Sequence, residues 1–343
     1  MNYQLHHLSH TDLDGYSCQM VTRHFFESIS FYNSNYGKEI NECFNQILDT
    51  IQTSSLHKHV ILITDLNLTL EQAKEFDSKI NICDKEVLLL LLDHHKTGEE
   101  CSQSFQWYFL DSNRCATKIT YDFFAELFGH DEKLNAFVNV VNAVDIWLED
   151  KPEFELGKVC MGMVSGAREV NKIMFPKENS QYLFSLLSEA QNYFTCKDAH
   201  IALDDAMHSI KKHFFQENTE QTNTLSNLVS TYNVKLLSKN REKMQIMYKE
   251  YKGILSYNIG NVSVIGNDFL TANPDFDFFM DVTSKKTISL RSNGKVDVSK
   301  MAATIANGGG HHNASGGLLS TFKDAFIYDT IKNQVVTIIS SKG

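Results

Sequence analysis

The sequence predicts an α/β protein with three parts: an N-terminal domain built on a parallel sheet, a helical connector and a smaller C-terminal α+β domain. The chain of 343 residues is long enough for two domains with substantial cores. Residues 87–92 are six consecutive aliphatic residues, which is typical of a strand buried on both faces of a parallel sheet. Around this strand, strand-like and helix-like segments alternate, as they do in sheets that helices cover on both sides.

The N-terminal domain is expected to span residues 1–150. Its predicted strands are residues 3–9, 30–33, 59–66, 86–92 and 106–110. Its predicted helices are residues 16–28, 38–52, 69–80, 115–128 and 132–148. Each strand is thus separated from the next by a stretch long enough for a crossover, which is what parallel neighbours require.

The remainder of the chain has a different pattern. Residues 151–240 show helical periodicity with few strand signals, and we interpret them as the connector. The C-terminal domain is expected to span residues 241–343. In it, residues 251–259, 262–269, 276–282 and 286–292 alternate like antiparallel strands, and a glycine-rich turn and a helix near residues 324–336 follow.

Composition narrows the class of protein. Hydrophobic residues make up 42% and charged residues 22% of the chain, and no apolar run is long enough to span a membrane. The N-terminus lacks the pattern of a secretory signal, so we expect a cytoplasmic protein. The net charge of -10 argues against a protein that coats long nucleic acid, because that affinity comes from phosphate neutralisation. The seven cysteines include no C-x-x-C pair, so neither a zinc cluster nor a disulfide framework is predicted.

Carboxylates and imidazoles follow the predicted strands at the edge where chemistry gathers in parallel sheets. The candidates are His10, Asp12 and Asp14 after the first strand, Asp65 after the third, Asp93, His94 and His95 after the fourth, and Asp145 in an apolar helix. In an extended loop, alternation would point the first three to one side. The set suits two divalent cations, most naturally Mn²⁺, with Mg²⁺, Fe²⁺ and Co²⁺ as alternatives, and no thiolate is expected to take part.

Each motif also has a structural explanation when taken alone. The H-x-D-x-D segment could be a turn with a helix cap, and Asp65 could cap the following helix. The adjacent histidines could be structural. Asp145 is harder to explain in this way, because an unpaired buried aspartate is disfavoured.

The predicted C-terminal domain contains the segment GGGHHNASGG, residues 308–317. Glycines let a backbone approach an anion closely, His311 can donate to a phosphate oxygen, and Arg291 can pair with phosphate through two hydrogen bonds. A tight connection between strands is the alternative explanation. We predict a phosphate-binding segment.

Together these motifs resemble the DHH phosphoesterases that carry a DHH-associated C-terminal domain. The resemblance covers nearly the whole chain, in order: SHTDLDG at residues 9–15, ITDL at 63–66, LLDHH at 91–95, the Asp145 helix, and GGGHHNASGG with Arg291. It implies one metal held by His10, Asp12 and Asp65 and another by Asp14, Asp65, His94 and Asp145. It also implies that His95 lies near the scissile phosphate, that Asp93 orients a histidine, and that Arg291, Gly309, Gly310, His311 and His312 bind the phosphate across an interdomain cleft. Where many relatives have a serine- or threonine-rich turn, this chain has Arg114 and Thr117, which we expect to contact the substrate instead.

Within that family the sequence is most similar to the NrnB group of oligoribonucleases and cyclic-nucleotide phosphodiesterases. We therefore predict a two-metal phosphodiesterase that acts as an exonuclease on short oligoribonucleotides (nanoRNA) or linear dinucleotides and releases nucleoside monophosphates. The alternatives are a cyclic mono- or dinucleotide phosphodiesterase, a 3'-phosphoadenosine 5'-phosphate phosphatase, a polyphosphate hydrolase and a nucleotide sensor without catalysis. Neither long duplex nucleic acid nor a membrane is an expected partner, and a homodimer is compatible with the sequence.

Overall fold

The computed structural model describes residues 3–342, which form two compact units. The N-terminal unit comprises the residues up to Ala167 together with Leu183–Met207. The C-terminal unit comprises Arg168–Tyr182 and the residues from His208 onward. Among the described residues, no helix is both long enough and apolar enough to cross a membrane.

A five-stranded, entirely parallel sheet is the centre of the N-terminal unit. Its strands are β1 (Tyr3–Ser9), β2 (Ile29–Asn33), β3 (Lys58–Thr64), β4 (Glu86–Asp93) and β5 (Tyr108–Leu110). They are arranged in the order β2-β1-β3-β4-β5, with every neighbouring pair parallel. All five strands predicted from the sequence are confirmed, and so is the parallel sheet.

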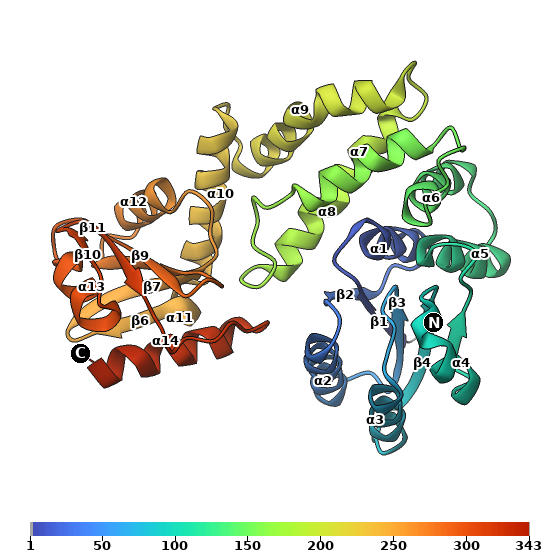
Figure 1. Ribbon diagram of the computed structural model, residues 1–343, viewed down its shortest axis with the longest axis horizontal. Helices are drawn as coiled ribbons and strands as arrows, with labels where there is room; N and C mark the ends of the chain where they lie inside the picture. The colour runs from blue at the N-terminus through green and yellow to red at the C-terminus, as the bar shows by residue number, and fades with distance from the viewer. Residues whose placement is uncertain (1–2, 343) are drawn as a thin grey trace. The chain divides into compact units, whose positions relative to one another are not determined.

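Helices cover both faces of this sheet (Figure 1). They are α1 (Leu13–Phe25), α2 (Lys38–Thr53), α3 (Leu70–Asn81), α4 (Glu99–Ser104), α5 (Ala116–Phe128) and α6 (Glu132–Asp145). Side chains of α2, α3 and α4 form one core with β1, β3 and β4, in which the rings of Phe44 and Phe76 stack 3.7 Å apart. The other face packs Leu5, Leu62 and Leu92 against α5. Burial on both faces explains the aliphatic runs of β3 and β4, whereas β1 also carries polar side chains.

The strand order creates a switch point between β1 and β3. The connection from β1 leads through α1 to β2, whereas the next connection leads through α2, on the opposite face, to β3. In open α/β sheets, ligands bind beyond the carboxyl ends of the strands at such a point. The loops after Ser9 and Thr64, with the neighbouring end of β4 at Asp93, are therefore where a functional site is expected.

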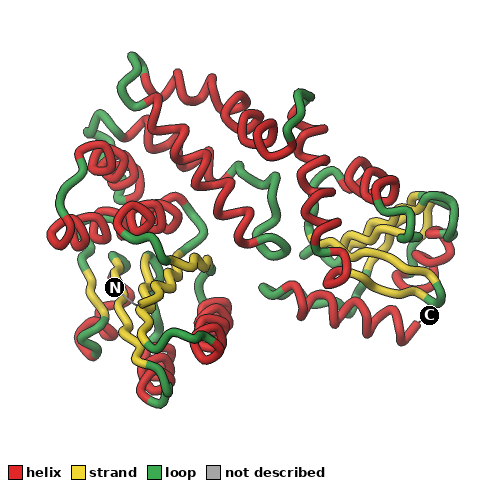
Figure 2. The backbone as a smooth tube through the Cα atoms, turned by 180° about the vertical axis from the view of Figure 1, so that it is seen from behind, coloured by secondary structure: helices red, strands yellow, loops and turns green. Residues whose placement is uncertain are grey.

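The C-terminal unit has its own six-stranded sheet. The strands are β6 (Gln245–Tyr248), β7 (Tyr251–Tyr257), β8 (Phe278–Val282), β9 (Thr287–Ser292), β10 (Gly309–His311) and β11 (Ala314–Leu318), in the order β10-β11-β9-β8-β7-β6. Helices α13 (Val298–Ala306) and α14 (Tyr328–Lys342) pack their apolar side chains on it. Figure 2 shows the strands of each unit gathered into one sheet. The mixed α+β character predicted for this part of the chain is confirmed.

One predicted strand of the C-terminal domain is wrong. Residues 262–269 belong to helix α12 (Val262–Ala272), although Val262, Val264 and Ile265 favour a strand. The physical reason is that β7 and β8 are parallel, not antiparallel as expected, so a crossover must join them. The buried positions in α12, Ile265, Gly266, Phe269 and Leu270, follow the helical period.

The segment between the two sheets is helical. Its helices are α7 (Phe154–Ser165), α8 (Pro176–Ala190), α9 (Ala199–Thr219), α10 (Leu225–Lys239) and the short α11 (Arg241–Met244). A 3₁₀ turn, Gln191–Tyr193, lies between α8 and α9, and another, Lys96–Gly98, follows β4. Among the N-terminal helices, α4 was not predicted, and α1 begins at Leu13, three residues earlier than expected, because Asp12 caps it.

A buried histidine in β1 supports the loops at the switch point. Nδ1 of His7 lies 2.8 Å from the hydroxyl oxygen of Thr22, and Nε2 of His7 lies 2.8 Å from the hydroxyl oxygen of Thr64. The Thr22 hydroxyl donates to the carbonyl of Gln19, so it accepts from Nδ1–H, and Nε2 accepts from Thr64. His7 is therefore neutral, and burial lowers its pKa to about 3.

We expect this histidine to make stability fall with acidity. His7 takes up a proton near pH 6.5 in the unfolded chain and near pH 3 in the folded chain. Its neutral form therefore contributes fully to the free energy of unfolding above pH 6.5, and this contribution decreases as the pH falls. Between pH 6.5 and pH 5 the loss is about 2 kcal/mol. Urea unfolding at several pH values, compared with His7→Gln, measures it. Equal pH slopes in the two proteins would contradict the prediction.

Candidate active site

The loop between β1 and α1 supplies two of the predicted ligands, His10 and Asp12, and the first turn of α1 supplies a third, Asp14. Nδ1 of His10 lies 2.8 Å from Oδ2 of Asp12, and Oδ1 of Asp12 accepts a 3.0 Å hydrogen bond from the backbone N–H of Gly15. Asp12 is thus the N-cap of α1 as well as a neighbour of His10. The expectation that Asp14 would lie in an extended segment with them is wrong, because Asp14 belongs to the first turn of α1.

Glycine is required at position 15. A Cβ there would lie 2.4 Å from the backbone oxygen of His10. We expect Gly15→Ala to displace His10 and Asp12, to cost about 1–3 kcal/mol of stability, and to lower activity and Mn²⁺ affinity together. Thermal unfolding and Mn²⁺ titration by electron paramagnetic resonance test this. Gly162→Ala is the control, because a Cβ at that helical glycine meets nothing within 4 Å, and unaltered Mn²⁺ binding in Gly15→Ala would contradict the prediction.

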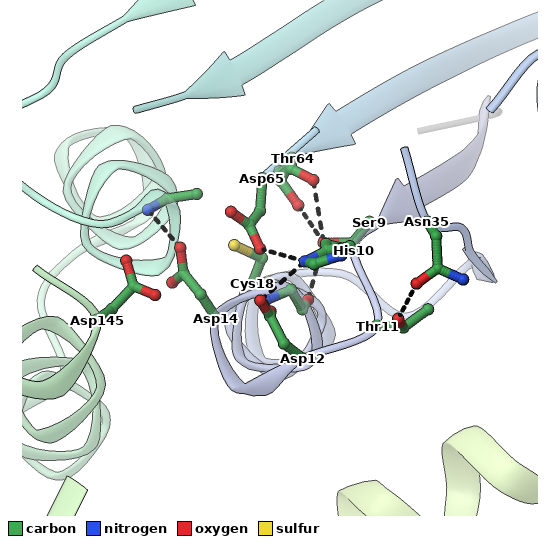
Figure 3. A network of polar contacts seen from close by, with 12 residues as sticks. Ser9, His10, Thr11, Asp12, Asp14, Cys18, Asn35, Thr64, Asp65 and Asp145 are labelled. Atoms are coloured by element: carbon green, nitrogen blue, oxygen red, sulfur yellow. Dashed lines mark hydrogen bonds and ion pairs between the residues drawn. The ribbon is translucent and has the colours of Figure 1, made fainter. Parts of the chain in front are cut away.

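Asp65 lies at the centre of the site (Figure 3). It follows β3 in the left-handed region, with φ 55°, and is 2% exposed. Its Oδ2 lies 3.7 Å from Nδ1 of His10, and its Oδ1 lies 3.4 Å from Nε2 of His94. Among the residues that the structure describes, none forms a hydrogen bond with Oδ2, which is unusual for a buried carboxylate oxygen.

His94 faces the other half of the cluster. Its Nε2 lies 3.8 Å from Oδ2 of Asp14 and 3.5 Å from Oδ2 of Asp145. Asp14 is held by the start of α5, whose backbone N–H groups at Ala116 and Thr117 each donate to its carboxylate at 2.8 Å. The helix N-terminus therefore stabilises this buried charge.

The charges of this cluster are not balanced by the protein. Burial and the neighbouring Asp14 raise the pKa of Asp65 well above its ordinary value, and the same two causes raise the pKa of Asp145 to about 9. Although burial opposes it, the contacts of His10 with the carboxylates of Asp12 and Asp65 raise the pKa of its imidazole to about 10. A set of crowded carboxylates, two imidazoles and one unsatisfied carboxylate oxygen fits divalent cations. Three groups of side chains could each hold an ion: His10, Asp12 and Asp65; Asp65, His94 and His95; and Asp14, Cys115 and Asp145.

Beside the cluster, Asp93 fixes the orientation of His95. Asp93 is fully buried at the end of β4, and its Oδ1 lies 2.7 Å from Nδ1 of His95. The hydroxyl of Tyr108 donates to its Oδ2 at 3.0 Å. The imidazole therefore keeps a proton on Nδ1 and presents Nε2 for other contacts.

Comparison with known proteins identifies relatives of this chain. No family model matches the chain. A curated protein of Helicobacter pylori named 3',5'-cyclic-nucleotide phosphodiesterase is 43% identical over 346 residues, covering 98% of this chain and 99% of that protein. The chain belongs to the DHH phosphoesterase family. Its members hydrolyse phosphoric ester bonds, and Asp93-His94-His95 is the DHH triplet of this member.

Two further relatives of this DHH phosphoesterase were found. Oligoribonuclease NrnB of Bacillus subtilis is 24% identical over 322 residues, covering 91% of this chain and 72% of that protein. The crystal structure of an uncharacterized protein from Helicobacter pylori G27 is 43% identical, covers 99% of both chains and superimposes with a TM-score of 0.92. The latter shows the same fold over the whole length.

The two residues expected to replace a serine-rich turn of the DHH family are engaged within the protein. Arg114 pairs with Asp111, at 2.7 Å, and with Asp122. Thr117 is fully buried, and its hydroxyl donates to the backbone oxygen of Asp14 at 2.8 Å. For Thr117 we propose a role in positioning Asp14 rather than in contacting substrate.

Sequence reasoning also overlooked two residues of this DHH site. Cys115 was set aside with the other thiols, yet its sulfur belongs to one of the three groups that could hold an ion. Burial, followed by the effect of Asp14, raises the pKa of its thiol well above the ordinary value, and the sulfur caps α5. Nothing in the sequence indicated a functional role for Tyr108, because a tyrosine in a short strand is typical of a hydrophobic core.

The predicted phosphate-binding residues lie in the C-terminal unit of the DHH chain. Ala314 of β11 pairs with Arg291 on one side and His311 on the other, so these two residues share a face of the sheet. Arg291 donates to the hydroxyl of Ser263 at 2.7 Å, and His312 lies 3.0 Å from Oδ1 of Asn313. His311, His312, Gly309 and Gly310 are exposed.

The glycines of this segment have a packing role as well. A Cβ at Gly308 would lie 2.0 Å from the backbone oxygen of Gly316, and one at Gly317 would lie 2.6 Å from Cβ of Ala306. Gly310 has φ +145°. Close strand contact thus explains these glycines without a ligand, whereas at Gly309 a Cβ would meet nothing within 4 Å. Phosphate binding by the segment stays a prediction.

Proposed function

We propose that this protein is a divalent-metal-dependent phosphodiesterase that acts on small nucleotides. The observation that carries the proposal is the buried Asp65 with one unsatisfied oxygen, set among Asp12, Asp14 and Asp145 and two histidines. Such an arrangement is costly to the folded protein unless cations complete it. A DHH chain that retains it is better suited to catalysis than to nucleotide sensing.

The ligand sets are proposed as follows. One cation would be held by His10, Asp12 and Asp65, and a second by Asp14, Asp65, His94 and Asp145. Bound Mn²⁺, or another divalent cation, would supply an activated water and offset the charge of the phosphate. The side-chain chemistry suits Mn²⁺ because it combines imidazole and carboxylate ligands.

The protein's own residues would then orient the phosphate. Asp93 holds the proton of His95 on Nδ1 and, although burial opposes it, raises the pKa of this imidazole. The doubly protonated ring would donate from Nε2 to a phosphate oxygen, which would replace the contact with the Tyr36 hydroxyl. Asp14 keeps its place because α5 donates to both of its carboxylate oxygens. We further propose that Arg291 and His311 bind a substrate phosphate, since both lie on one face of the C-terminal sheet.

Two substrate classes are supported by different observations. The relative with 43% identity over nearly the whole chain is named as a 3',5'-cyclic-nucleotide phosphodiesterase, which favours cyclic mononucleotides. The relative with 24% identity is named as an oligoribonuclease, which favours short RNA and linear dinucleotides, the class predicted from the sequence. Both classes contain a phosphodiester on a ribose that carries a nucleobase.

Hydrolysis assays with purified protein and Mn²⁺ test the proposal. The substrates are cyclic AMP, linear pApA, cyclic di-AMP, labelled RNA di- to pentanucleotides, 3'-phosphoadenosine 5'-phosphate and pyrophosphate. Metal-dependent release of nucleoside monophosphate from cyclic AMP or from pApA and short RNA supports it and identifies the class. Faster turnover of pyrophosphate, or tight nucleotide binding without turnover, would overturn it.

A further inference from the structure

Tyr36 is an exposed aromatic residue at the edge of the candidate active site, and neither the metal ligands nor the DHH triplet accounts for it. Its side chain is 41% exposed. Its ring centroid lies 4.7 Å from that of His10 and 5.7 Å from that of His95, with the second pair edge to face. Its hydroxyl lies 3.1 Å from Nε2 of His95. Tyr36 thus touches histidines from two different strand ends.

The backbone on either side of Tyr36 is anchored. The N–H of Ser34 donates to the carbonyl of Ser9 at 3.0 Å. The side chain of Asn35 accepts from the hydroxyl of Thr11 at 2.8 Å, as Figure 3 shows, and donates to Glu39 at 2.7 Å. Gly37, with φ +81°, turns the chain into α2, and its carbonyl accepts from Gln72. The ring is therefore presented by a fixed loop.

The hydroxyl of Tyr36 is not needed to orient His95. Asp93 already holds Nδ1 of that imidazole at 2.7 Å, and Asp93 is itself buried and held by Tyr108. The contact with Nε2 therefore serves chiefly to hold the tyrosine ring at the site. A half-exposed ring held in this way offers an apolar surface beside a cluster of charged groups.

We propose that the ring of Tyr36 stacks on the nucleobase of the substrate and so selects nucleotides over other phosphodiesters. This inference rests on the proposed function, because it requires a phosphate at the metal cluster. In a nucleotide the base is separated from that phosphate by one ribose. An aromatic surface at the edge of the site could therefore contact the base while the phosphate lies at the metal cluster. Stacking tolerates any base, so the ring gives preference for nucleotides rather than for one sequence.

The test compares Tyr36→Leu and Tyr36→Phe with the natural protein on paired substrates. The pairs are cyclic AMP with 1-deoxyribose 3',5'-cyclic phosphate, and pApA with analogues that lack one base. Tyr36→Leu should lower the ratio of kcat/KM for the base-bearing over the base-free member by about 5- to 150-fold, mainly through KM. Tyr36→Phe, which keeps the ring, should retain most of this ratio.

Phe123→Leu is the matched control, since Phe123 is also 41% exposed but lies on α5 and belongs to none of the metal-binding groups. It should leave the ratio unaltered. An unaltered ratio in Tyr36→Leu, or an equal loss in Tyr36→Leu and Tyr36→Phe, would overturn the stacking role. Neither of these two results would contradict the proposed function. The proposed function would fail if the natural protein hydrolysed neither cyclic AMP nor pApA.

Discussion

Asp65→Asn is expected to abolish most of the hydrolysis and, at the same time, to stabilise the metal-free protein. The substitution removes the carboxylate shared by both proposed ligand sets, and we expect kcat/KM to fall by at least about 10²-fold. In the absence of metal, however, burial and Asp14 hold the pKa of Asp65 well above its ordinary value, and Oδ2 has no hydrogen bond. Replacing this buried carboxyl by a neutral amide should stabilise the metal-free fold by about 1–3 kcal/mol.

Thermal unfolding with and without Mn²⁺ separates the two effects. The natural protein should gain stability when Mn²⁺ is added, because a cation that binds only the folded state shifts the unfolding equilibrium. Asp65→Asn should unfold at a higher temperature without Mn²⁺ and gain little when it is added. Asp84→Asn, at an exposed position before β4, is the control for the loss of one negative charge. A normal Mn²⁺ response in Asp65→Asn would show that Asp65 is not a ligand.

Asp93→Asn is expected to lower activity by about 10- to 100-fold while metal binding is largely preserved. Asp93 accepts from both His95 and Tyr108, whereas an asparagine amide has one acceptor oxygen for these two donors. Nδ1 of His95 then either loses its partner or changes its protonation, and the imidazole is no longer oriented. The measurements are kcat, KM and Mn²⁺ affinity for the same preparation.

Tyr108→Phe gives the graded comparison for this prediction. It removes one of the two donors to Asp93 but leaves the hydrogen bond to His95, so the loss of activity should be smaller than in Asp93→Asn. If Asp93→Asn lost Mn²⁺ affinity in proportion to activity, Asp93 would be acting on the metal cluster rather than on His95. Equal losses in both variants would show that Tyr108 is as important as the carboxylate.

The fold of the N-terminal unit was predictable because its signals are local. Residues 87–92 lie in β4, whose C-terminal part is buried between two helical layers although Leu88 near its start is 63% exposed. A continuous aliphatic run has few other uses in a chain of this composition. The convergence of the proposed ligands was predictable for a related reason: Asp65 and His94 follow the ends of neighbouring parallel strands, which necessarily meet at one edge. Their convergence follows from the direction of the strands.

The errors occurred where tertiary structure overrides local pattern. Residues 262–269 contain β-branched residues in alternation, and only the parallel pairing of β7 and β8 requires a helix there. Asp14 was expected in an extended loop, but Asp12 caps α1 before it. The positions of Thr117 and Cys115 depend on how α5 meets α1, and no spacing in the sequence indicates that contact.

The hydrogen bonds between Asp14 and the start of α5 couple the proposed metal site to folding. They join residues 102 and 103 positions apart in the sequence, so they form only when β1, α1 and α5 have all taken their places. The same carboxylate is a proposed metal ligand. A substitution of Asp14 would therefore affect both the proposed metal ligand and the contact between α1 and α5. Evolution cannot change one of these roles at this position without changing the other.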